Sequence, residues 1–319
     1  MSKRVKISVI VPVYNVQAYL PYALQSLMDQ TLEDVEFVCV NDGSTDDSLA
    51  ILEEFAKKDR RFVVISQKNG GLSAARNTGI KASNGEHIMF LDSDDFLDKH
   101  ACERVWIEFE EGPTDIVIFG TNIVPNMPVA PDWYWWNLTV YSSRHQGFDP
   151  KLFFEVPSSK PFVWRQAFAR KFLEKNGVLF DENVRFGEDV IFQFQAFAYA
   201  ENVSYISDPI YHYRWQRSGS LMATANKNMT GLVYEHINIV SKILEFFKVK
   251  DMFDKFGFRL FEWTIEFVGM DIVNETLENN REMASYLCEI LASYGIKNYK
   301  HQFSSLNKRT YKKLIKIAK

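Results

Sequence analysis

Cysteine is scarce in this sequence: Cys39, Cys102 and Cys288 are the only three among 319 residues, and no CxxC pair occurs. An odd number of widely spaced cysteines argues against both a disulfide framework and a zinc site. This usage is typical of proteins from a reducing compartment, so we expect a cytoplasmic protein.

Long hydrophobic runs are also absent. No stretch approaches the ~18 uncharged apolar residues that a membrane-spanning helix needs. The apolar run from Ile7 to Val13 is short, β-branched and interrupted by Pro12, which indicates a strand rather than a signal peptide. With 37 basic and 41 acidic residues the net charge is −4, so we expect no nucleic-acid partner.

Three common motifs of nucleotide-binding proteins and hydrolases are missing. No GxGxxG follows the first apolar run, which removes the main support for a nicotinamide or flavin dinucleotide fold. No GxxxxGK[ST] occurs, so the chain is not a P-loop enzyme. No GxSxG occurs, so the nucleophile elbow of the α/β-hydrolases is excluded as well.

The first 120 residues alternate between strand and helix patterns. Strand patterns lie at 6–13, 35–40, 61–66, 87–91 and 115–119, and helical patterns lie at 18–29, 46–58 and 73–82, the last with Ser73 as its cap. Such alternation predicts an α/β fold with a mostly parallel central sheet. Ligands of these sheets bind at the carboxyl ends of the strands.

The pattern changes after residue 120. Residues 161–200 have helical spacing, 203–213 indicate a strand pair or an extended connection, and the chain from about 226 onward is mainly helical. We therefore expect three regions, spanning residues 1–125, 126–225 and 226–319.

An acidic turn follows the fourth strand pattern. Asp92 and Asp94 are two residues apart at the end of a strand, so their side chains point the same way and can share one ion. Two carboxylates suit Mg²⁺ or Mn²⁺ when substrate phosphates and water complete the coordination. The alternative is a plain acidic turn, because aspartate favours turns.

Two further polar loops follow strands. Asp42 in Asn41-Asp-Gly-Ser-Thr-Asp is placed to read a base or ribose at the sheet edge. The segment can equally be a tight turn in which Thr45 or Asp46 caps the next helix, and both can hold at once. In Asn69-Gly-Gly-Leu-Ser-Ala-Ala-Arg-Asn the glycines let the backbone approach a ligand, and Arg76 can neutralise a diphosphate. A solvated arginine is the alternative.

Two segments of the second region carry further candidates. In Gly187-Glu-Asp, Asp189 can act as a general base with Glu188 orienting it or the acceptor; the alternative is two acids stabilised by a helix N-terminus. Further on, Arg214 and Arg217 resemble a loop that covers phosphates. His212 beside them is either a metal ligand or a core histidine.

Taken in order, these motifs resemble glycosyltransferase family 2, whose members are inverting enzymes of the GT-A fold. The matching segments are Ser8-Val-Ile-Val-Pro-Val-Tyr-Asn, Asn41-Asp-Gly-Ser-Thr-Asp, Asn69-Gly-Gly-Leu-Ser-Ala-Ala-Arg-Asn-Thr-Gly and Asp92-Ser-Asp. Val163-Trp-Arg, Phe180-Asp-Glu and Gly187-Glu-Asp are similar to the acceptor half of bacterial members. The resemblance covers roughly residues 6–220.

The resemblance implies a donor site within residues 1–125. Pro12, Tyr14 and Asp42 would hold the base and ribose of a nucleotide sugar, most often a uridine diphosphate sugar. Asn69 and Arg76 would lie along the donor.

The acidic turn would complete that site. Asp92 would contact ribose or sugar, with Ser93 beside it, and Asp94 would bind the Mn²⁺ or Mg²⁺ that bridges the diphosphate. Asp189, in the acceptor-binding region 126–225, would take the proton from the acceptor hydroxyl.

The implied function is a metal-dependent inverting transfer of sugar to a hydroxyl of a surface glycan or a lipid-linked oligosaccharide. One alternative is a non-catalytic module of the same fold that binds a sugar nucleotide or glycan. A sugar nucleotidyltransferase is another, but it needs a basic glycine-rich loop where residues 10–20 have Val-Pro-Val-Tyr-Asn.

Three expectations concern partners. The aromatic run at 133–136 would line an acceptor groove or pack against protein, because aromatic faces suit both. The basic tail from Lys308 would rest on the inner face of an anionic membrane or remain a solvated helix end. The helices after 226 suit a homodimer.

Overall fold

The computed structural model describes residues 4–124, 137–147, 149–156, 159, 162–215, 228–274 and 279–319. The chain forms two compact units, Met1–Trp215 and Gln216–Lys319. The division of the first unit into a donor region and an acceptor region at residue 125 stays a prediction.

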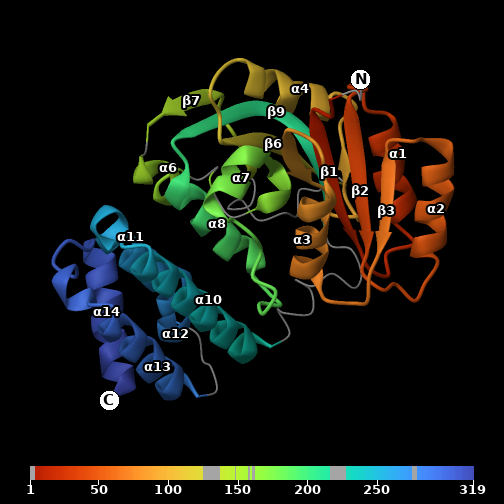
Figure 1. Cartoon of the computed structure of the whole chain (residues 1–319). Coiled ribbons are helices and arrows are strands. Elements are labelled where there is room, and N and C mark those ends of the chain that lie inside the picture. Colours follow the sequence, from red (N-terminus) through yellow and green to blue (C-terminus); the bar gives the residue numbers. More distant parts are fainter. Residues whose placement is uncertain are drawn as a thin grey trace. The chain divides into compact units, whose positions relative to one another are not determined.

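The first unit begins with a parallel α/β layer, as the alternating pattern predicts (Figure 1). Its elements are β1 (Ile7–Val13), α1 (Leu20–Met28), β2 (Val35–Asn41), α2 (Ser48–Lys58), β3 (Phe62–Ser66), α3 (Leu72–Ala82) and β4 (His87–Phe90). The four strands are parallel in the order β3-β2-β1-β4. Their carboxyl ends therefore share one edge, where the loops carrying Asp42 and Asp92 begin.

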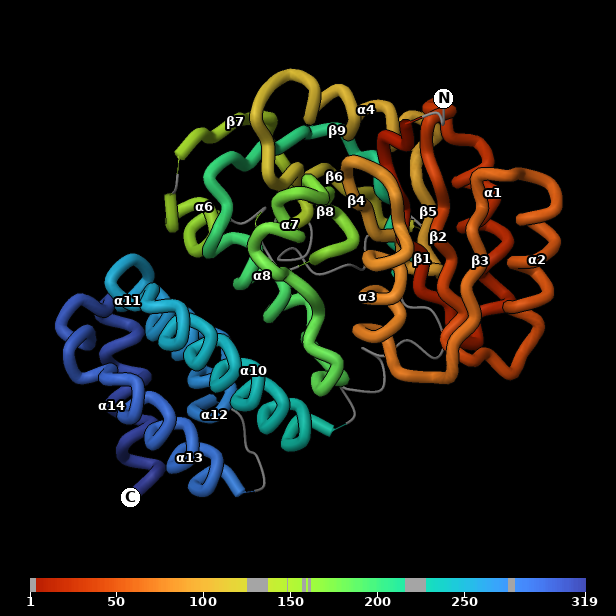
Figure 2. The backbone as a smooth tube through the Cα atoms, viewed as in Figure 1, coloured from red at the N-terminus to blue at the C-terminus, as the bar shows by residue number. Residues whose placement is uncertain are grey.

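The remaining strands of the first unit extend the same sheet, and helices connect them. These elements are β5 (Phe96–Leu97), α4 (Ala101–Glu110), β6 (Ile116–Val124), β7 (Ser143–Gln146), α6 (Pro150–Phe154), η2 (Val163–Arg165), β8 (Gln166–Ala169), α7 (Arg170–Asn176), α8 (Glu188–Tyr199) and β9 (Asn202–Arg214). The sheet order is β3-β2-β1-β4-β8-β6-β9-β5, with β7 on β9. Figure 2 follows the chain through β4, β8 and β6. The expected mostly parallel central sheet is confirmed.

One local expectation is wrong in this region, and of the two alternatives for residues 203–213 the strand pair is wrong while the extended segment is confirmed. Residues 161–200 are not helical throughout, because Gln166–Ala169 form β8, which pairs antiparallel with both β4 and β6. Residues 203–213 belong to one strand, β9, whose register with β6 shifts at Gly120. A side chain at Gly120 would lie 2.7 Å from the carbonyl oxygen of Ser207, so this close approach requires glycine.

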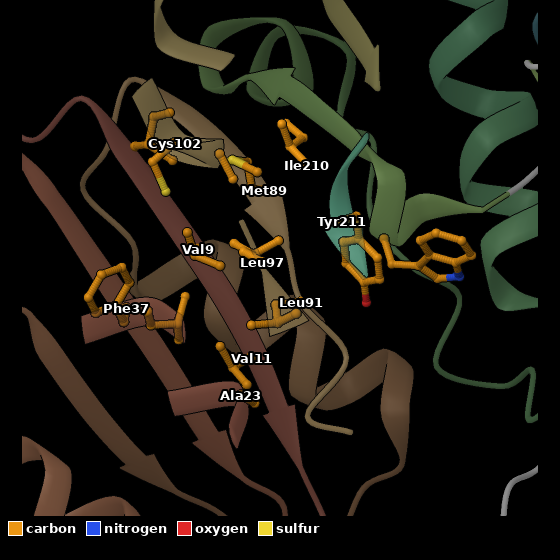
Figure 3. Close-up of a cluster of buried hydrophobic side chains, with 14 of the residues drawn as sticks. Val9, Val11, Ala23, Phe37, Met89, Leu91, Leu97, Cys102, Ile210 and Tyr211 are labelled. Carbon is orange, nitrogen blue, oxygen red and sulfur yellow. The ribbon is translucent and has the colours of Figure 1, made fainter. Parts of the chain in front are cut away.

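One face of the sheet is covered by α1, α2 and α4. Figure 3 shows Val9 and Val11 of β1 packed with Ala23 of α1 and Cys102 of α4 in this buried cluster. Because alternate residues of a strand point to opposite faces, Val9 and Val11 share this side while Ile10 faces the other.

The opposite face is covered by α3, α6, α7 and α8. Ile10 packs there in one cluster with Ile80 of α3 and Phe192 of α8. A Cβ atom at Gly79 would lie 2.3 Å from Cγ2 of Ile10, so glycine lets α3 rest directly on β1. The helix begins at Leu72 with Gly71 as its N-cap, and Ser73 makes no capping hydrogen bond, so the expected Ser73 cap is wrong.

The second unit is helical, which confirms the expected C-terminal helical region. Its elements are α10 (Met229–Val249), α11 (Phe253–Thr264), the π-helical turn η3 (Ile265–Gly269), α12 (Met270–Asn274), α13 (Asn280–Ser293), η4 (Ile296–Asn298) and α14 (Ser305–Ala318). Among the residues that the structure describes, no helix has the length and apolar character needed to cross a membrane.

Candidate active site

Arg76 lies at the centre of the candidate site and joins its two halves. Its Nη2 donates to Oδ1 of Asp92 over 2.9 Å, and its Nη1 donates to Oε1 of Glu188 over 2.7 Å. The Arg76 side chain is only 3% exposed, and its guanidinium carbon lies 5.1 Å from the ring centroid of Phe180. Burial alone would lower the pKa of Arg76, but the two carboxylates raise it, so the guanidinium stays charged.

Helix α3 holds the second half of the site through the next residue as well. Asn77 donates its side-chain N–H to the carbonyl oxygen of Phe180 and to Oε1 of Glu182, each over 2.9 Å. The backbone N–H of Phe180 donates back to Oδ1 of Asn77 over 3.0 Å. These bonds fix the segment that leads to Gly187, the N-cap of α8, where φ is +75°.

Asp189 follows Glu188 in the first turn of α8. Burial, followed by the neighbouring Glu188 carboxylate, raises the pKa of Asp189 to about 8, although Arg76 and the N–H of Val190 oppose the shift. Its Oδ1 accepts from that N–H over 2.8 Å. Arg76 pairs with Asp92 and Glu188 and also lowers the pKa of Asp189, so its one positive charge is outnumbered when all three carboxylates are ionised.

The acidic turn is held in place by β9. The hydroxyl of Tyr211 donates to Oδ2 of Asp95 over 2.7 Å and accepts from the backbone N–H of Asp92 over 3.2 Å. The backbone N–H of Arg214 donates to Oδ1 of Asp95 over 2.7 Å. Burial, with the nearby Asp94 and Asp92 carboxylates, raises the pKa of Asp95 well above its usual range.

Asp95 and Tyr211 were missed by the sequence reasoning. Asp95 belongs to the visible acidic run, but its partner is 116 residues away in the chain. No motif in the sequence connects these two positions.

Arg214 reaches the acidic turn with its side chain too. Its Nε donates to the carbonyl oxygen of Asp94 over 2.9 Å. Its guanidinium carbon lies 5.3 Å from the ring centroid of Tyr19, 5.7 Å from that of Tyr22 and 5.9 Å from that of Phe96. Arg217, the other expected phosphate contact, lies outside the described residues, as does the aromatic run at 133–136.

Asp42 shapes the glycine loop that precedes α3. Its Oδ1 accepts from the side chain of Gln67 over 2.8 Å and from the N–H of Gly70 over 2.9 Å. Its Oδ2 accepts from the N–H of Gly71 over 2.8 Å. Asp42 is 3% exposed, and its role toward a base or ribose stays a prediction.

The other expected donor contacts lie at or beside the same edge. Pro12 is buried near the end of β1, and Tyr14 just beyond it is 52% exposed. Asn69 is exposed in the glycine loop, close to Gly43, where a Cβ atom would lie 2.9 Å from its backbone nitrogen. Ser93 is buried within the acidic turn.

His212 lies in β9, where its ring stacks on Phe96 with 4.7 Å between centroids. Burial lowers the pKa of His212, and Asp98 partly offsets this shift. In the described part of the chain, no three His, Cys, Asp or Glu side chains form a group that could hold a metal, so Asp92, Asp94 and His212 are not gathered into one.

A divalent cation nevertheless fits the donor set at the acidic turn. Asp92 and Asp94 supply hard carboxylate oxygens, and Mg²⁺ commonly binds to one or two carboxylates together with substrate phosphates and water. The excess negative charge around Arg76 would also favour a cation there. The role of His212 as a further ligand stays a prediction.

The fold matches solved structures of glycosyltransferases. The crystal structure of residues 1–349 of Staphylococcus aureus TarS in complex with UDP-GlcNAc superposes with a TM-score of 0.60 at 22% identity, covering 96% of this chain and 78% of that one. A mannosyltransferase from Pyrobaculum calidifontis in complex with GDP-Man and Mn²⁺ gives a TM-score of 0.55 at 16% identity, covering 98% of this chain and 86% of the mannosyltransferase. The sheet order and these likenesses define a GT-A fold.

The sequence assigns the family. The model of glycosyl transferase family 2 matches residues 8–172, and the chain belongs to that family. It is 38% identical over 224 residues to the glycosyltransferase EpsJ of Bacillus subtilis, covering 65% of this chain and 60% of EpsJ. The poly(ribitol-phosphate) β-N-acetylglucosaminyltransferase TarS is 29% identical over 231 residues, covering 69% of this chain and 37% of TarS. The chain thus spans about 60% of EpsJ and a smaller share of TarS.

Proposed function

We propose that this chain transfers a sugar from a nucleoside diphosphate donor, a UDP-sugar, to a hydroxyl of a surface glycan or lipid-linked oligosaccharide, with inversion at the anomeric carbon. The observation that carries this proposal is the buried Arg76 bridge. Through it, Asp92 at the carboxyl edge of the parallel sheet is tied to Glu188, the neighbour of Asp189. Donor edge and candidate base thereby form one cluster.

Asp189 is the candidate base. In the reaction, the acceptor hydroxyl oxygen bonds to the anomeric carbon while the bond from that carbon to the diphosphate oxygen breaks. The hydroxyl proton passes to the Asp189 carboxylate, and the nucleoside diphosphate leaves on the opposite face, which inverts the configuration. The raised pKa of Asp189 supports this role, because a carboxylate with a higher pKa accepts a proton more readily.

Glu188 and Arg76 act as positioning residues in this scheme. Both side chains of the Arg76–Glu188 ion pair are nearly buried, so the first turn of α8 is fixed relative to the acidic turn. Two hydrogen bonds to carboxylates occupy Arg76, so we propose that it orients the site rather than binding the diphosphate itself. The diphosphate contact is then proposed for Arg214, whose Nε donates to the carbonyl oxygen of Asp94.

Asp94 and Asp92 would hold the divalent cation. When bound, Mn²⁺ or Mg²⁺ would neutralise charge on the departing diphosphate. The carboxylate donor set supports this assignment, and so does the Mn²⁺ in the crystal structure of the mannosyltransferase of the same fold.

The printed names and complexes of the relatives support the substrate classes. TarS was crystallised with UDP-GlcNAc, which favours a UDP-sugar donor here. The name of TarS specifies a poly(ribitol-phosphate) acceptor, which favours a surface polymer as the acceptor class.

A thermal-shift panel of UDP, GDP, CDP, TDP and their sugar conjugates, each with and without Mn²⁺, tests the donor site. A ligand at about 100 times its dissociation constant adds ~2.7 kcal/mol to the folded state, enough to raise the melting temperature by several degrees. We expect a shift confined to uridine ligands that increases with Mn²⁺. No shift with any nucleotide would contradict the proposal.

The same panel separates the alternatives when it is combined with assays of the products. Release of pyrophosphate from UTP and a sugar phosphate would indicate a nucleotidyltransferase. Binding of a sugar nucleotide without transfer to any member of a broad acceptor panel would indicate a non-catalytic module.

A further inference from the structure

Charge is distributed very unevenly along this chain. The last 30 residues, 290–319, contain eight Lys or Arg residues and no Asp or Glu. The preceding 289 residues therefore hold 29 basic and 41 acidic residues, so the end of the chain is strongly cationic while the rest is anionic.

Helix α14 displays much of this positive charge on one side. Its exposed cations line a shallow hollow on the helix surface together with Ser305: Lys308, Arg309, Lys312, Lys313 and Lys316. Within the described ranges, none of these five side chains forms an ion pair with a carboxylate. Lys308, Lys312 and Lys316 recur every fourth residue and so rise along the helix in steps of about 6 Å.

The other side of α14 is committed to its own unit. Asn307, Thr310 and Leu314 are buried, and Asn307 donates to Oε1 of Glu266 over 2.8 Å. With this apolar side packed inside the helical unit, the outer face of α14 is mainly cationic, and Leu306, which is 50% exposed, is too little apolar surface to insert into lipid.

We propose that the outer face of α14 docks on the surface of an anionic lipid bilayer by electrostatic attraction, without insertion. The five cations occupy two adjacent ridges of the helix, and a broad negative surface can reach both ridges at once. A single linear polyanion would follow one ridge. The anionic balance of the preceding residues disfavours contact of other faces with the same surface.

The test is co-sedimentation with vesicles. This measurement needs neither donor nor acceptor, so a negative result would contradict membrane docking without affecting the proposed sugar transfer. We expect the chain to bind vesicles of equal parts phosphatidylcholine and phosphatidylglycerol, to ignore phosphatidylcholine alone, and to dissociate as salt is raised. Each Lys or Arg near an anionic bilayer strengthens binding about fivefold, so Lys308→Gln/Lys312→Gln/Lys316→Gln is expected to bind roughly 100-fold more weakly.

A matched control removes three exposed lysines from the first unit, as Lys57→Gln/Lys171→Gln/Lys175→Gln. This control lowers the net charge by the same amount but leaves α14 unchanged. Because the proposal places the binding face on α14, the control should keep the affinity of the unaltered chain for the vesicles. An equal loss in both variants would overturn the proposal in favour of overall charge. Binding to polyphosphate without binding to anionic vesicles would assign the face to a soluble polyanion, and binding to neutral vesicles would indicate insertion. Circular dichroism checks that both variants keep their helices.

Discussion

The surroundings of Asp189 affect its pKa in opposite directions. The residue lies at a helix N-terminus, which favours a negative charge, but burial and the adjacent Glu188 have the larger effect and raise its pKa to about 8. A carboxyl with a raised pKa in the fold stabilises the protein below its unfolded pKa of ~4, and this stability is lost as the pH rises through the folded value.

This imbalance predicts how Asp189→Asn changes stability. Asparagine is neutral at every pH, so the variant avoids the cost of ionising a half-buried carboxyl beside the Glu188 carboxylate. Without nucleotide or metal, the melting temperature of the variant should exceed that of the unaltered chain by an amount that grows between about pH 4 and pH 8. Thermal unfolding across this range measures the difference. A difference that stays flat or falls with pH would contradict the raised pKa.

Sequence reasoning could propose the residues of the site but not their contacts. Asp92, Glu188 and Asp189 are visible in the sequence because each follows a clear strand pattern or opens a helical one. The ion pair between Arg76 and Glu188 spans 112 residues, and the sequence carries no distance between positions so far apart. The structure therefore supplies the positioning function proposed for Arg76.

At the scale of elements, the contact between α3 and β1 positions the site, because α3 carries both Arg76 and Asn77. The parallel strands were predictable because each is a run of apolar, often β-branched residues. Strand β8 was missed because Gln166–Ala169 contains no β-branched residue and lies in a stretch with helical spacing. It lies between β4 and β6 only through distant pairing.

Gly79→Ala tests that packing. Alanine normally stabilises a helix interior, but here its Cβ would lie 2.3 Å from Cγ2 of Ile10. We expect the steric clash with Ile10 to outweigh the gain in helix propensity and to lower the free energy of unfolding by about 1–3 kcal/mol. Thermal unfolding measures this change. Gly112→Ala is the control, because its nearest atom is Nη1 of Arg144 at 3.4 Å, the end of a flexible side chain. Equal stability of the two variants would show that α3 does not need glycine there.

At the scale of the whole molecule, the fold comparison covers nearly the whole chain, whereas the family model covers only part of it. The family model matches residues 8–172, inside the first unit, while the second unit holds the cationic helix α14. Donor chemistry is thus proposed for the first unit and membrane docking for the second. The sequence predicted a helical C-terminal region from its periodicity, but which face of α14 is exposed required the packing of Asn307 and Leu314.

The central claim is that Asp189 removes the acceptor proton in a transfer from a nucleotide sugar. The most direct test compares the unaltered chain with Asp189→Asn, measuring acceptor-dependent release of UDP alongside the thermal shift given by UDP. We predict that Asp189→Asn keeps the UDP shift and loses transfer by about 10²–10⁴-fold, the contribution of a positioned base. Asp254→Asn, which alters an exposed carboxyl of the second unit, should keep both. Transfer by Asp189→Asn at a rate near that of the unaltered chain would contradict the account.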